Sequence, residues 1–342
     1  MPSRVNLLGL SLEQLAEEFT ASGLSVLDAK RVFPWIHSKL ASSFDMMSDV
    51  PLSVRKVMCE RYSVSLPKCI EKQESIDGTQ KALLELEDGC HIETVWIPEE
   101  RRITTCVSSQ VGCILGCKFC HTGMQKFVRN LTSSEIIAQI FFWNSITGRK
   151  TTNVVFMGMG EPLLNFDNVS NVLRLLLDRK NHNFSRNKIT VSTAGIVDDT
   201  LMQLAVFGVK LAISLHASND EKRSSLMPIN RKYCIKMLLE AAKTYCKTSN
   251  TDCVTFEYIL LRGMNDTASD AAELCKLLRS IPCKVNLIMM NCWPGSPFAS
   301  SDSRRANDFS AQLLLNGIRT TIRKPKGEDI LAACGQLNSS KL

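Results

Sequence analysis

Three cysteines within eight residues are the most specific chemical feature of this chain. Cys113, Cys117 and Cys120 are spaced four and then three positions apart, directly after a predicted strand. Thiolates at this spacing can reach one metal centre from a single loop. Zinc sites usually have four protein ligands, and cubane iron–sulfur clusters normally take four cysteines. Because no fourth cysteine is equally placed, the motif favours a cluster with one iron open to a substrate or cofactor, and a zinc knuckle is the alternative.

A second candidate is the glycine-rich turn Gly158-Met-Gly-Glu-Pro162, which contains Gly160 and Glu161 and follows the next predicted strand. A Gly-x-Gly turn is usually only a turn. No third glycine follows in register, so the segment is not a dinucleotide-binding fingerprint. Whether this turn binds a ligand therefore depends on which residues the neighbouring strands and helices place beside it.

The elements that must position these motifs alternate between strand and helix from about residue 99 onward. Repeated strand–helix units predict a parallel sheet or barrel with right-handed crossovers. Six units are too few for a closed eight-stranded barrel, so an incomplete barrel and an open sheet both fit the pattern. In either fold the active site lies at the carboxyl ends of the strands. The predicted strands are 103–108, 153–157, 188–193, 209–215, 254–261 and 284–290. The predicted helices are 133–146, 168–178, 199–207, 234–246 and 268–279, and a further helix and strand follow near 304–315 and 318–323.

The region before residue 99 has a different pattern. Apolar residues at helical spacing predict helices after Ser11, over about 28–39 and over about 51–62, where Pro34 requires the second helix to start or kink. Three short strands then follow, separated by Asp-Gly turns that are typical of hairpins. These strands are predicted at 70–74, 80–86 and 91–96. We therefore expect residues 1–98 to form an accessory domain, 99–329 to form the core, and 330–342 to be a separate C-terminal segment.

Composition narrows the class of protein. The formal charge is +7, and residues 1–98 hold 10 Lys and Arg against 14 Asp and Glu, whereas the remaining residues hold 31 against 20. A basic C-terminal part suits a polyanion such as nucleic acid, although a solvated lysine-rich surface would look the same. No apolar run approaches the roughly 18 residues of a membrane span, and no export signal is evident, so we expect a cytoplasmic protein. Most of the 14 cysteines should then be reduced and buried.

The cysteine loop, with Phe119 before its last cysteine, resembles the radical S-adenosylmethionine superfamily. Further segments in the same order resemble the RlmN/Cfr group of RNA adenine methyltransferases, and the likeness extends over nearly the whole chain. They are Glu93-Thr-Val-Trp-Ile-Pro, Cys106-Val-Ser-Ser-Gln-Val-Gly-Cys113, Met157-Gly-Met-Gly-Glu-Pro-Leu, Ser192-Thr-Ala-Gly, Ile213-Ser-Leu-His-Ala and Ala332-Ala-Cys334-Gly-Gln-Leu. One departure lies in Met290-Asn-Cys-Trp-Pro-Gly295, beside the expected adenosyl pocket.

The resemblance implies an α/β fold: a partial (βα)6 radical SAM barrel with a small N-terminal accessory domain of helices and a β-meander. It implies one 4Fe-4S cluster on the three cysteines and two S-adenosylmethionine molecules per turnover. Cys334 would accept a methyl group, Cys106 would resolve an RNA–protein adduct, and Glu93 would remove a proton from the base. The residues expected to bind S-adenosylmethionine are Gly160, Glu161, Ser192, Ser214, Leu215, His216 and Asn291.

The same resemblance implies the partners. They are an adenine in the peptidyl-transferase region of 23S rRNA, an adenosine 3′ to the anticodon of tRNA, and an electron donor such as flavodoxin or ferredoxin. The expected target is carbon 2, and the protein is expected to be a monomer without a membrane contact. The alternatives are a carbon 8 methyltransferase, another radical enzyme and a zinc-bearing RNA-binding module. The candidates for contacts with phosphates are Lys118, Lys126, Arg129, Arg304, Arg305, Arg323, Lys324 and Lys326.

Overall fold

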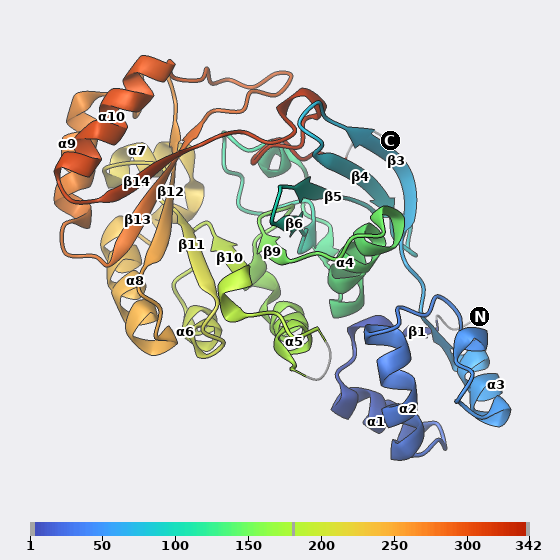
Figure 1. The fold of residues 1–342 in the computed structure, drawn as a ribbon. Coiled ribbons are helices and arrows are strands. Elements are labelled where there is room, and N and C mark those ends of the chain that lie inside the picture. Colours follow the sequence, from blue (N-terminus) through green and yellow to red (C-terminus); the bar gives the residue numbers. More distant parts are fainter. Residues whose placement is uncertain (1–3, 180–181, 340–342) are drawn as a thin grey trace.

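The computed structural model describes residues 4–179 and 182–339. Its centre is one curved sheet of ten strands in the order β14-β13-β12-β11-β10-β9-β6-β5-β4-β3 (Figure 1). Seven of these strands, from β6 to β14, pair in parallel. They are β6 Ile103–Cys106, β9 Asn153–Phe156, β10 Ile189–Thr193, β11 Lys210–Ser214, β12 Val254–Leu260, β13 Cys283–Met289 and β14 Arg319–Arg323. The predicted α/β fold, with a parallel sheet built from repeated strand–helix units, is confirmed.

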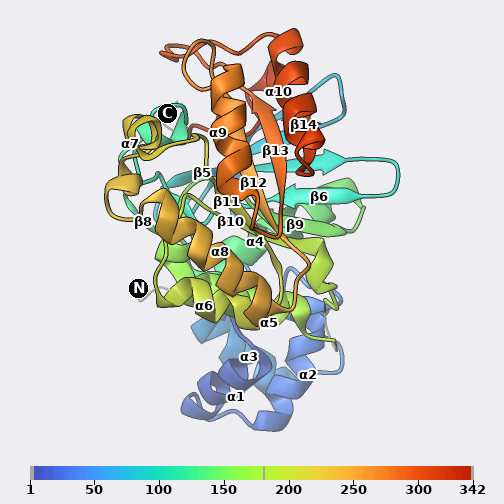
Figure 2. The same cartoon turned by 90° about the vertical axis from the view of Figure 1, so that its left-hand side faces the viewer.

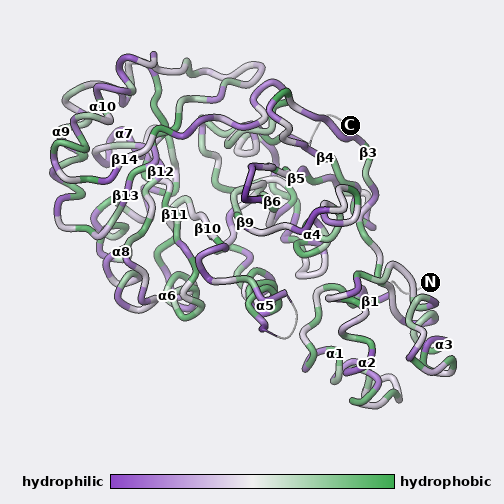
Figure 3. The backbone as a smooth tube through the Cα atoms, in the orientation of Figure 1, coloured by the Kyte–Doolittle hydropathy of each residue, from purple (hydrophilic) through white to green (hydrophobic). Residues whose placement is uncertain are grey.

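Helices cover the outer face of the parallel strands (Figures 1 and 2). They are α4 Ser133–Thr147, α5 Phe166–Leu177, α6 Asp199–Val206, α7 Asp220–Leu226, α8 Ile235–Ser249, α9 Ala268–Leu278 and α10 Ser303–Leu315. Local sequence fixes several starts: Thr132 and Glu135 form a capping box at α4, and Thr267 and Asp270 form one at α9. Figure 3 shows hydrophobic and hydrophilic residues alternating along α8, α9 and α10, as expected for helices with one face on the sheet.

The accessory helices lie together at one end of the molecule in both views (Figures 1 and 2). They are α1 Leu12–Ala21, α2 Val26–His37 and α3 Leu52–Arg61, with the short parallel pair β1 Val5–Asn6 and β2 Tyr62–Ser63 beside them. Ser11 caps α1, as its position predicts. Helix α2 neither starts nor ends at Pro34, which lies inside its last turn.

The β-meander extends the central sheet instead of standing apart from it. Its strands, β3 Lys68–Glu74, β4 Gln80–Glu85 and β5 His91–Pro98, are antiparallel, and β5 pairs with β6. The predicted boundary at residues 98 and 99 therefore falls between two hydrogen-bonded strands. The division into three domains stays a prediction.

Short elements complete the architecture, and none of them has a strong sequence signal. The hairpin β7 Gln110–Val111 and β8 Arg129–Asn130 holds the ends of the cysteine loop together. Single 3₁₀ turns occupy Leu7–Gly9, Phe44–Met46, Thr122–Met124, Pro162–Asn165, Arg186–Lys188, Pro228–Arg231 and Glu328–Ile330. No helix within residues 4–179 and 182–339 is long and apolar enough to cross a membrane.

Candidate active site

The three cysteines line one cavity at the carboxyl ends of the parallel strands, here called the cysteine cavity. Gly160, Glu161, Ser192, Ser214 and His216 line the same cavity from the ends of β9, β10 and β11. The barrel therefore brings together motifs that lie about one hundred residues apart, as the position of active sites in such folds predicts.

The loop that carries the cysteines is held by close backbone contacts. Gly112 has a positive φ of 73°, and a Cβ there would come within 2.2 Å of the Lys126 carbonyl oxygen. Only glycine fits this approach, which closes the loop at the β7–β8 hairpin. Burial raises the pKa of Cys113 to about 12 and also raises those of Cys117 and Cys120.

The donor set fits a 4Fe-4S cluster. The three thiols face one cavity, yet the described residues contain no group of three metal-binding side chains close enough for a single ion. A cubane presents its irons at separate corners, so it accepts thiolates that stand farther apart than the ligands of one ion. Iron also supplies the positive charge that three buried thiolates need.

Glu161 is the buried carboxylate of the cysteine cavity. Its Oε2 accepts a hydrogen bond from the Ala194 amide at 2.7 Å, and its Oε1 accepts one from the Leu163 amide at 3.1 Å. Gly160 before it has a φ of 95°, and a Cβ there would lie 2.5 Å from Cβ of Gln110. This tight turn presents a carboxylate to the cavity, where it can hold the ammonium group of an amino acid.

Binding of S-adenosylmethionine should weaken as the pH falls through about 7. Burial raises the pKa of Glu161 to about 7, and only the ionised carboxylate attracts an ammonium group. Below that pH, binding must release one proton, so Kd should rise about tenfold per pH unit. Kd measured by equilibrium dialysis between pH 5.5 and 8.5 checks this, with exposed Glu221→Gln as the control and a flat profile expected for Glu161→Gln. A wild-type Kd that does not change with pH would contradict the assignment.

Two neighbouring residues that were predicted to bind the cofactor lie in different surroundings: His216 lines the cysteine cavity and Leu215 does not. His216 has a φ of 57°, its Nδ1 accepts a hydrogen bond from the Ile259 amide at 3.0 Å, and burial lowers its pKa to about 3. The ring is therefore neutral, and it packs edge-on against Phe119. Leu215 is fully buried and lines neither this cavity nor the adjoining one described next.

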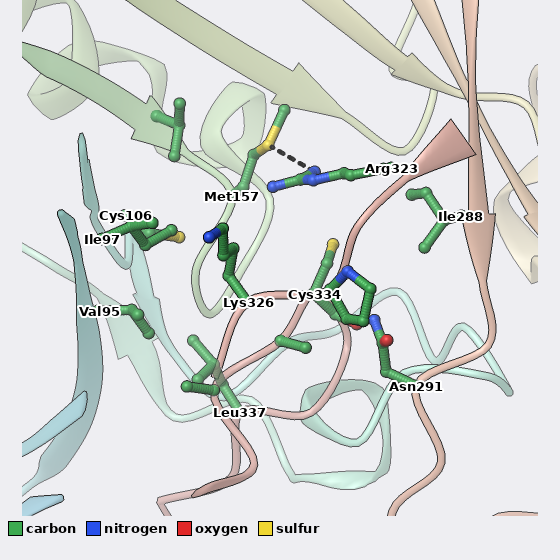
Figure 4. A pocket seen from close by; sticks show the side chains of 14 residues that line it. Val95, Ile97, Cys106, Met157, Ile288, Asn291, Arg323, Lys326, Cys334 and Leu337 are labelled. Carbon is green, nitrogen blue, oxygen red and sulfur yellow. Dashed lines mark hydrogen bonds between the residues drawn. The ribbon is translucent and has the colours of Figure 1, made fainter. Parts of the chain in front are cut away.

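A second pocket adjoins the cysteine cavity and holds two of the three catalytic candidates. Cys106, at the end of β6, and Cys334, in the C-terminal segment, point into it from different sides (Figure 4). We call it the thiol pocket. Asn291 lines it and donates a hydrogen bond to the Cys334 carbonyl oxygen at 3.1 Å. The thiol pocket and the cysteine cavity share Cys334 and Arg323, so the two spaces meet at these side chains.

Arg323 corrects a prediction made from sequence. Its charge suggested a surface contact with phosphate, but its side chain lies between the two cavities, where Nη1 is 3.9 Å from Sδ of Met157 (Figure 4). Burial raises the pKa values of Cys106 and Cys334, and the Arg323 guanidinium opposes that shift at both thiols. The position of Arg323 at the end of β14, a strand next to the predicted catalytic ends, is the signal that could have revealed this.

Other basic candidates are engaged within the protein. Arg129 contacts Asp88 at 2.7 Å and Glu135 at 2.8 Å, and Arg305 lies 3.4 Å from Asp266. These arginines therefore have structural partners besides any phosphate.

Sequence reasoning missed Arg223. This fully buried side chain donates hydrogen bonds to the carbonyl oxygens of Ala194 at 2.7 Å and Ser214 at 2.9 Å. It thereby joins the carboxyl ends of β10 and β11 behind the cysteine cavity. A basic residue inside the short polar helix α7 offers no sequence signal for such a role.

Glu93 lies beside the thiol pocket rather than in its wall. It is on the same face of β5 as Val95 and Ile97, which line that pocket. Its carboxylate contacts Lys81 Nζ at 2.9 Å and accepts a hydrogen bond from the Asn338 amide at 2.6 Å. The C-terminal segment therefore connects Glu93 to Cys334 through only a few residues.

Comparisons with known proteins agree with this geometry. Residues 107–278 match the model of the radical SAM superfamily, and residues 5–64 match the model of the ribosomal RNA large subunit methyltransferase N-terminal domain. The chain belongs to the RlmN family of the radical SAM superfamily. Members of that superfamily bind a 4Fe-4S cluster and S-adenosylmethionine, which fits the cysteine cavity.

Relatives in the RlmN family cover nearly the whole chain. The dual-specificity RNA methyltransferase RlmN of Paracoccus denitrificans is 43% identical and covers 98% of this chain and 90% of its own length. That of Rhodospirillum rubrum is 45% identical, with 100% and 82% covered. The crystal structure of a radical SAM methyltransferase from Sphaerobacter thermophilus matches with a TM-score of 0.93 and 41% identity, over 98% of this chain and all of that one. The predicted family is thereby confirmed.

Proposed function

We propose that this protein methylates carbon 2 of an adenine in 23S rRNA, in the peptidyl-transferase region, and of the adenosine 3′ to the anticodon in tRNA. The observation that carries the proposal is the junction of the thiol pocket with the cysteine cavity at Cys334. Carbon 2 lies between two ring nitrogens and is too electron-poor to attack a methylsulfonium. It does react with a carbon radical, so a thiol that can carry a methyl group beside a source of radicals suits this target.

The chemistry divides between the two cavities. Cys113, Cys117 and Cys120 would hold the cluster, which supplies the electron that cleaves one S-adenosylmethionine. Cys334, as a thiolate, would attack the methyl carbon of another S-adenosylmethionine, which would leave as S-adenosylhomocysteine, and would keep the methyl group as a thioether. This methyl group would give a hydrogen atom to the radical fragment that the cleavage supplies, and its carbon would then form a bond to carbon 2 of the base.

Release of the product requires two more side chains. Glu93 would take the proton from carbon 2, and the unpaired electron of the adduct would return to the cluster. Cys106, as a thiolate, would then attack the Cys334 sulfur. The bond between that sulfur and the transferred carbon would break, a disulfide would form, and the carbon would take up a proton, so that the base leaves with a methyl group. Attack requires a thiolate, and Arg323 is the cation placed beside both sulfurs.

The finer points of the proposal complete this scheme. Two S-adenosylmethionine molecules are consumed per methyl transferred, and an electron donor such as flavodoxin or ferredoxin reduces the cluster. The protein acts as a monomer in the cytoplasm, and residues 1–98 contact RNA. Lys118, Lys126, Arg304, Lys324 and Lys326 are the candidates for contacts with phosphate.

Mass analysis of nucleosides tests the function. RNA incubated without oxygen with the cluster-loaded protein, S-adenosylmethionine and a reductant should yield 2-methyladenosine, identified by its chromatographic retention. Formation of 8-methyladenosine would favour the carbon 8 alternative. Protein that contains zinc but no iron or sulfide, and yields no methylated nucleoside, would favour the RNA-binding module.

A variant pair separates the structural role of Glu93 from its role as a base. Lys81→Met should lower stability by about 3–5 kcal/mol, because it leaves a buried carboxylate without its cation. Lys81→Met/Glu93→Leu should recover most of that loss, since an apolar pair of similar volume is often neutral. Glu93→Gln leaves the buried Lys81 ammonium without its carboxylate, so it should lose a similar amount of stability, and the folded variant should form no product. Urea unfolding and the nucleoside assay check these results, and wild-type turnover by Glu93→Gln would contradict the role as a base.

A further inference from the structure

Glu257 is a buried carboxylate in the wall of the cysteine cavity that the proposed chemistry does not use. It occupies the middle of β12, is 5% exposed, and lines the cavity with Cys334 and Arg323. Its Oε1 accepts a hydrogen bond from Asn286 Nδ2 at 3.0 Å. Its Oε2 is buried and has no hydrogen-bond partner among the described residues. Glu257 is the only charged residue of β12, and it brings a carboxylate oxygen without a partner to the wall of the cavity.

Arg323 offers the complementary group. It lies on β14, two strands from β12, and lines the same cavity. Burial has the largest effect on both pKa values. In addition, the Arg323 charge lowers the pKa of Glu257 and the Glu257 charge raises the pKa of Arg323, as expected for two groups that attract each other. No ion pair within 4.0 Å joins them among residues 4–179 and 182–339. The two groups are thus near each other but separated, with donors on one and a free acceptor on the other.

Leaving a buried carboxylate oxygen such as Oε2 of Glu257 without a partner is costly. A buried polar group without a partner loses about 1–3 kcal/mol, and more when it is charged. A ligand that places a hydrogen-bond donor against Glu257 and an acceptor against Arg323 removes that cost. The edges of adenine have this pattern, since the N6 amino group donates and the neighbouring ring nitrogen, N1 or N7, accepts.

We propose that Glu257 and Arg323 form a recognition site for an edge of an adenine base. This inference rests on the proposed function and names a residue pair that selects the base. Because Arg323 also lines the thiol pocket, an adenine held there would lie beside Cys334. Two sources share this chemistry: the target base of the RNA, extruded from its stack, and the adenine of S-adenosylmethionine.

The test compares RNA that carries the target adenosine with RNA that carries purine ribonucleoside there, which lacks the amino group. Wild-type protein should prefer adenosine by about 10- to 100-fold in kcat/KM, the value of one hydrogen bond to a charged group. Glu257→Met should lose that preference by slowing on adenosine while staying within about 3-fold of wild type on purine. Glu257→Gln keeps an acceptor and should retain part of the preference. Glu240→Gln, an exposed carboxylate on α8, is the matched control.

A binding measurement distinguishes the two sources and does not depend on turnover. If the target base occupies the site, the Kd of adenosine RNA, measured by fluorescence anisotropy without reductant, should weaken in Glu257→Met and that of purine RNA should not. If the cofactor occupies it, the Kd of S-adenosylmethionine should weaken about 10- to 100-fold instead. Should Glu257→Met fail to fold, Glu257→Gln must show the partial loss in one of these two measurements. Unchanged selectivity together with an unchanged Kd for both ligands would overturn the proposal. A wild-type protein that methylates no adenosine would overturn the proposed function instead, while the cofactor measurement would still report on Glu257.

Discussion

Replacing Cys106 by alanine should trap RNA covalently on the protein through Cys334. Methyl transfer to Cys334, hydrogen abstraction and addition to the base do not involve Cys106. Release does, because Cys106 and Cys334 are the two cysteines among the described residues that line the thiol pocket. Free methylated RNA should fall roughly 1,000-fold or more, as when a nucleophile is removed from an enzyme. A slower band on a denaturing gel that disappears after nuclease treatment would display the adduct.

The complementary variant, Cys334→Ala, shows the order in which the two thiols act in the reaction. Cys334→Ala should form neither adduct nor product, because it cannot accept the first methyl group. Cys59→Ala, which removes an exposed thiol on α3, should behave as wild type. Wild-type release of methylated RNA by Cys106→Ala, with no adduct, would mean that Cys106 serves only in packing.

Cys117→Ala should abolish retention of the cluster and reductive cleavage of S-adenosylmethionine. Cys334 also lines the cysteine cavity, but it lies in the C-terminal segment and is proposed to carry the methyl group, so the variant leaves two thiolates of the cysteine loop for a cluster that needs three. Iron per chain should fall at least about tenfold, the lower end of what altered metal sites lose. Iron and sulfide analysis, and quantification of 5′-deoxyadenosine, measure both effects.

A matched control comes from the same chain. Cys246→Ala removes a buried thiol of α8 that lies outside both cavities, so it should retain iron and cleave the cofactor. Full iron content in Cys117→Ala would show that another residue completes the ligand set. In that case there would be no reason to expect that the iron without a cysteine ligand binds the cofactor.

The predicted elements are close to the observed ones where the chain is apolar and buried. Strand β12 was expected at 254–261 and spans Val254–Leu260, because every one of its residues is buried. Strand β6 was expected to reach residue 108 but ends at Cys106, where the chain turns toward the β7–β8 hairpin. Helix α7 was not predicted, since its seven residues are mostly polar and give no helical stripe.

The site also contains residues that the sequence predicted and residues that it did not. Spacing predicted the three cysteines, and the strand ends predicted the positions of Ser192 and Ser214. The place of Glu257 could not be read from sequence, because it depends on which strand faces which across the curved sheet, whereas the end of strand β14 was the one sequence signal for Arg323. A charge in a sequence does not state whether water or another side chain surrounds it.

The C-terminal segment has a consequence for how the protein is made. Its backbone is tied to the cysteine loop, since the His121 amide donates to the Gly335 carbonyl oxygen at 2.7 Å and Thr122 Oγ1 donates to that of Leu337 at 2.7 Å. All strands of the sheet leave the ribosome before this segment does. Iron and sulfide could therefore reach the cysteine loop of a nascent chain before the C-terminal segment is synthesised. Once Cys334 and its neighbours are in place, they would cover that side of the cysteine cavity.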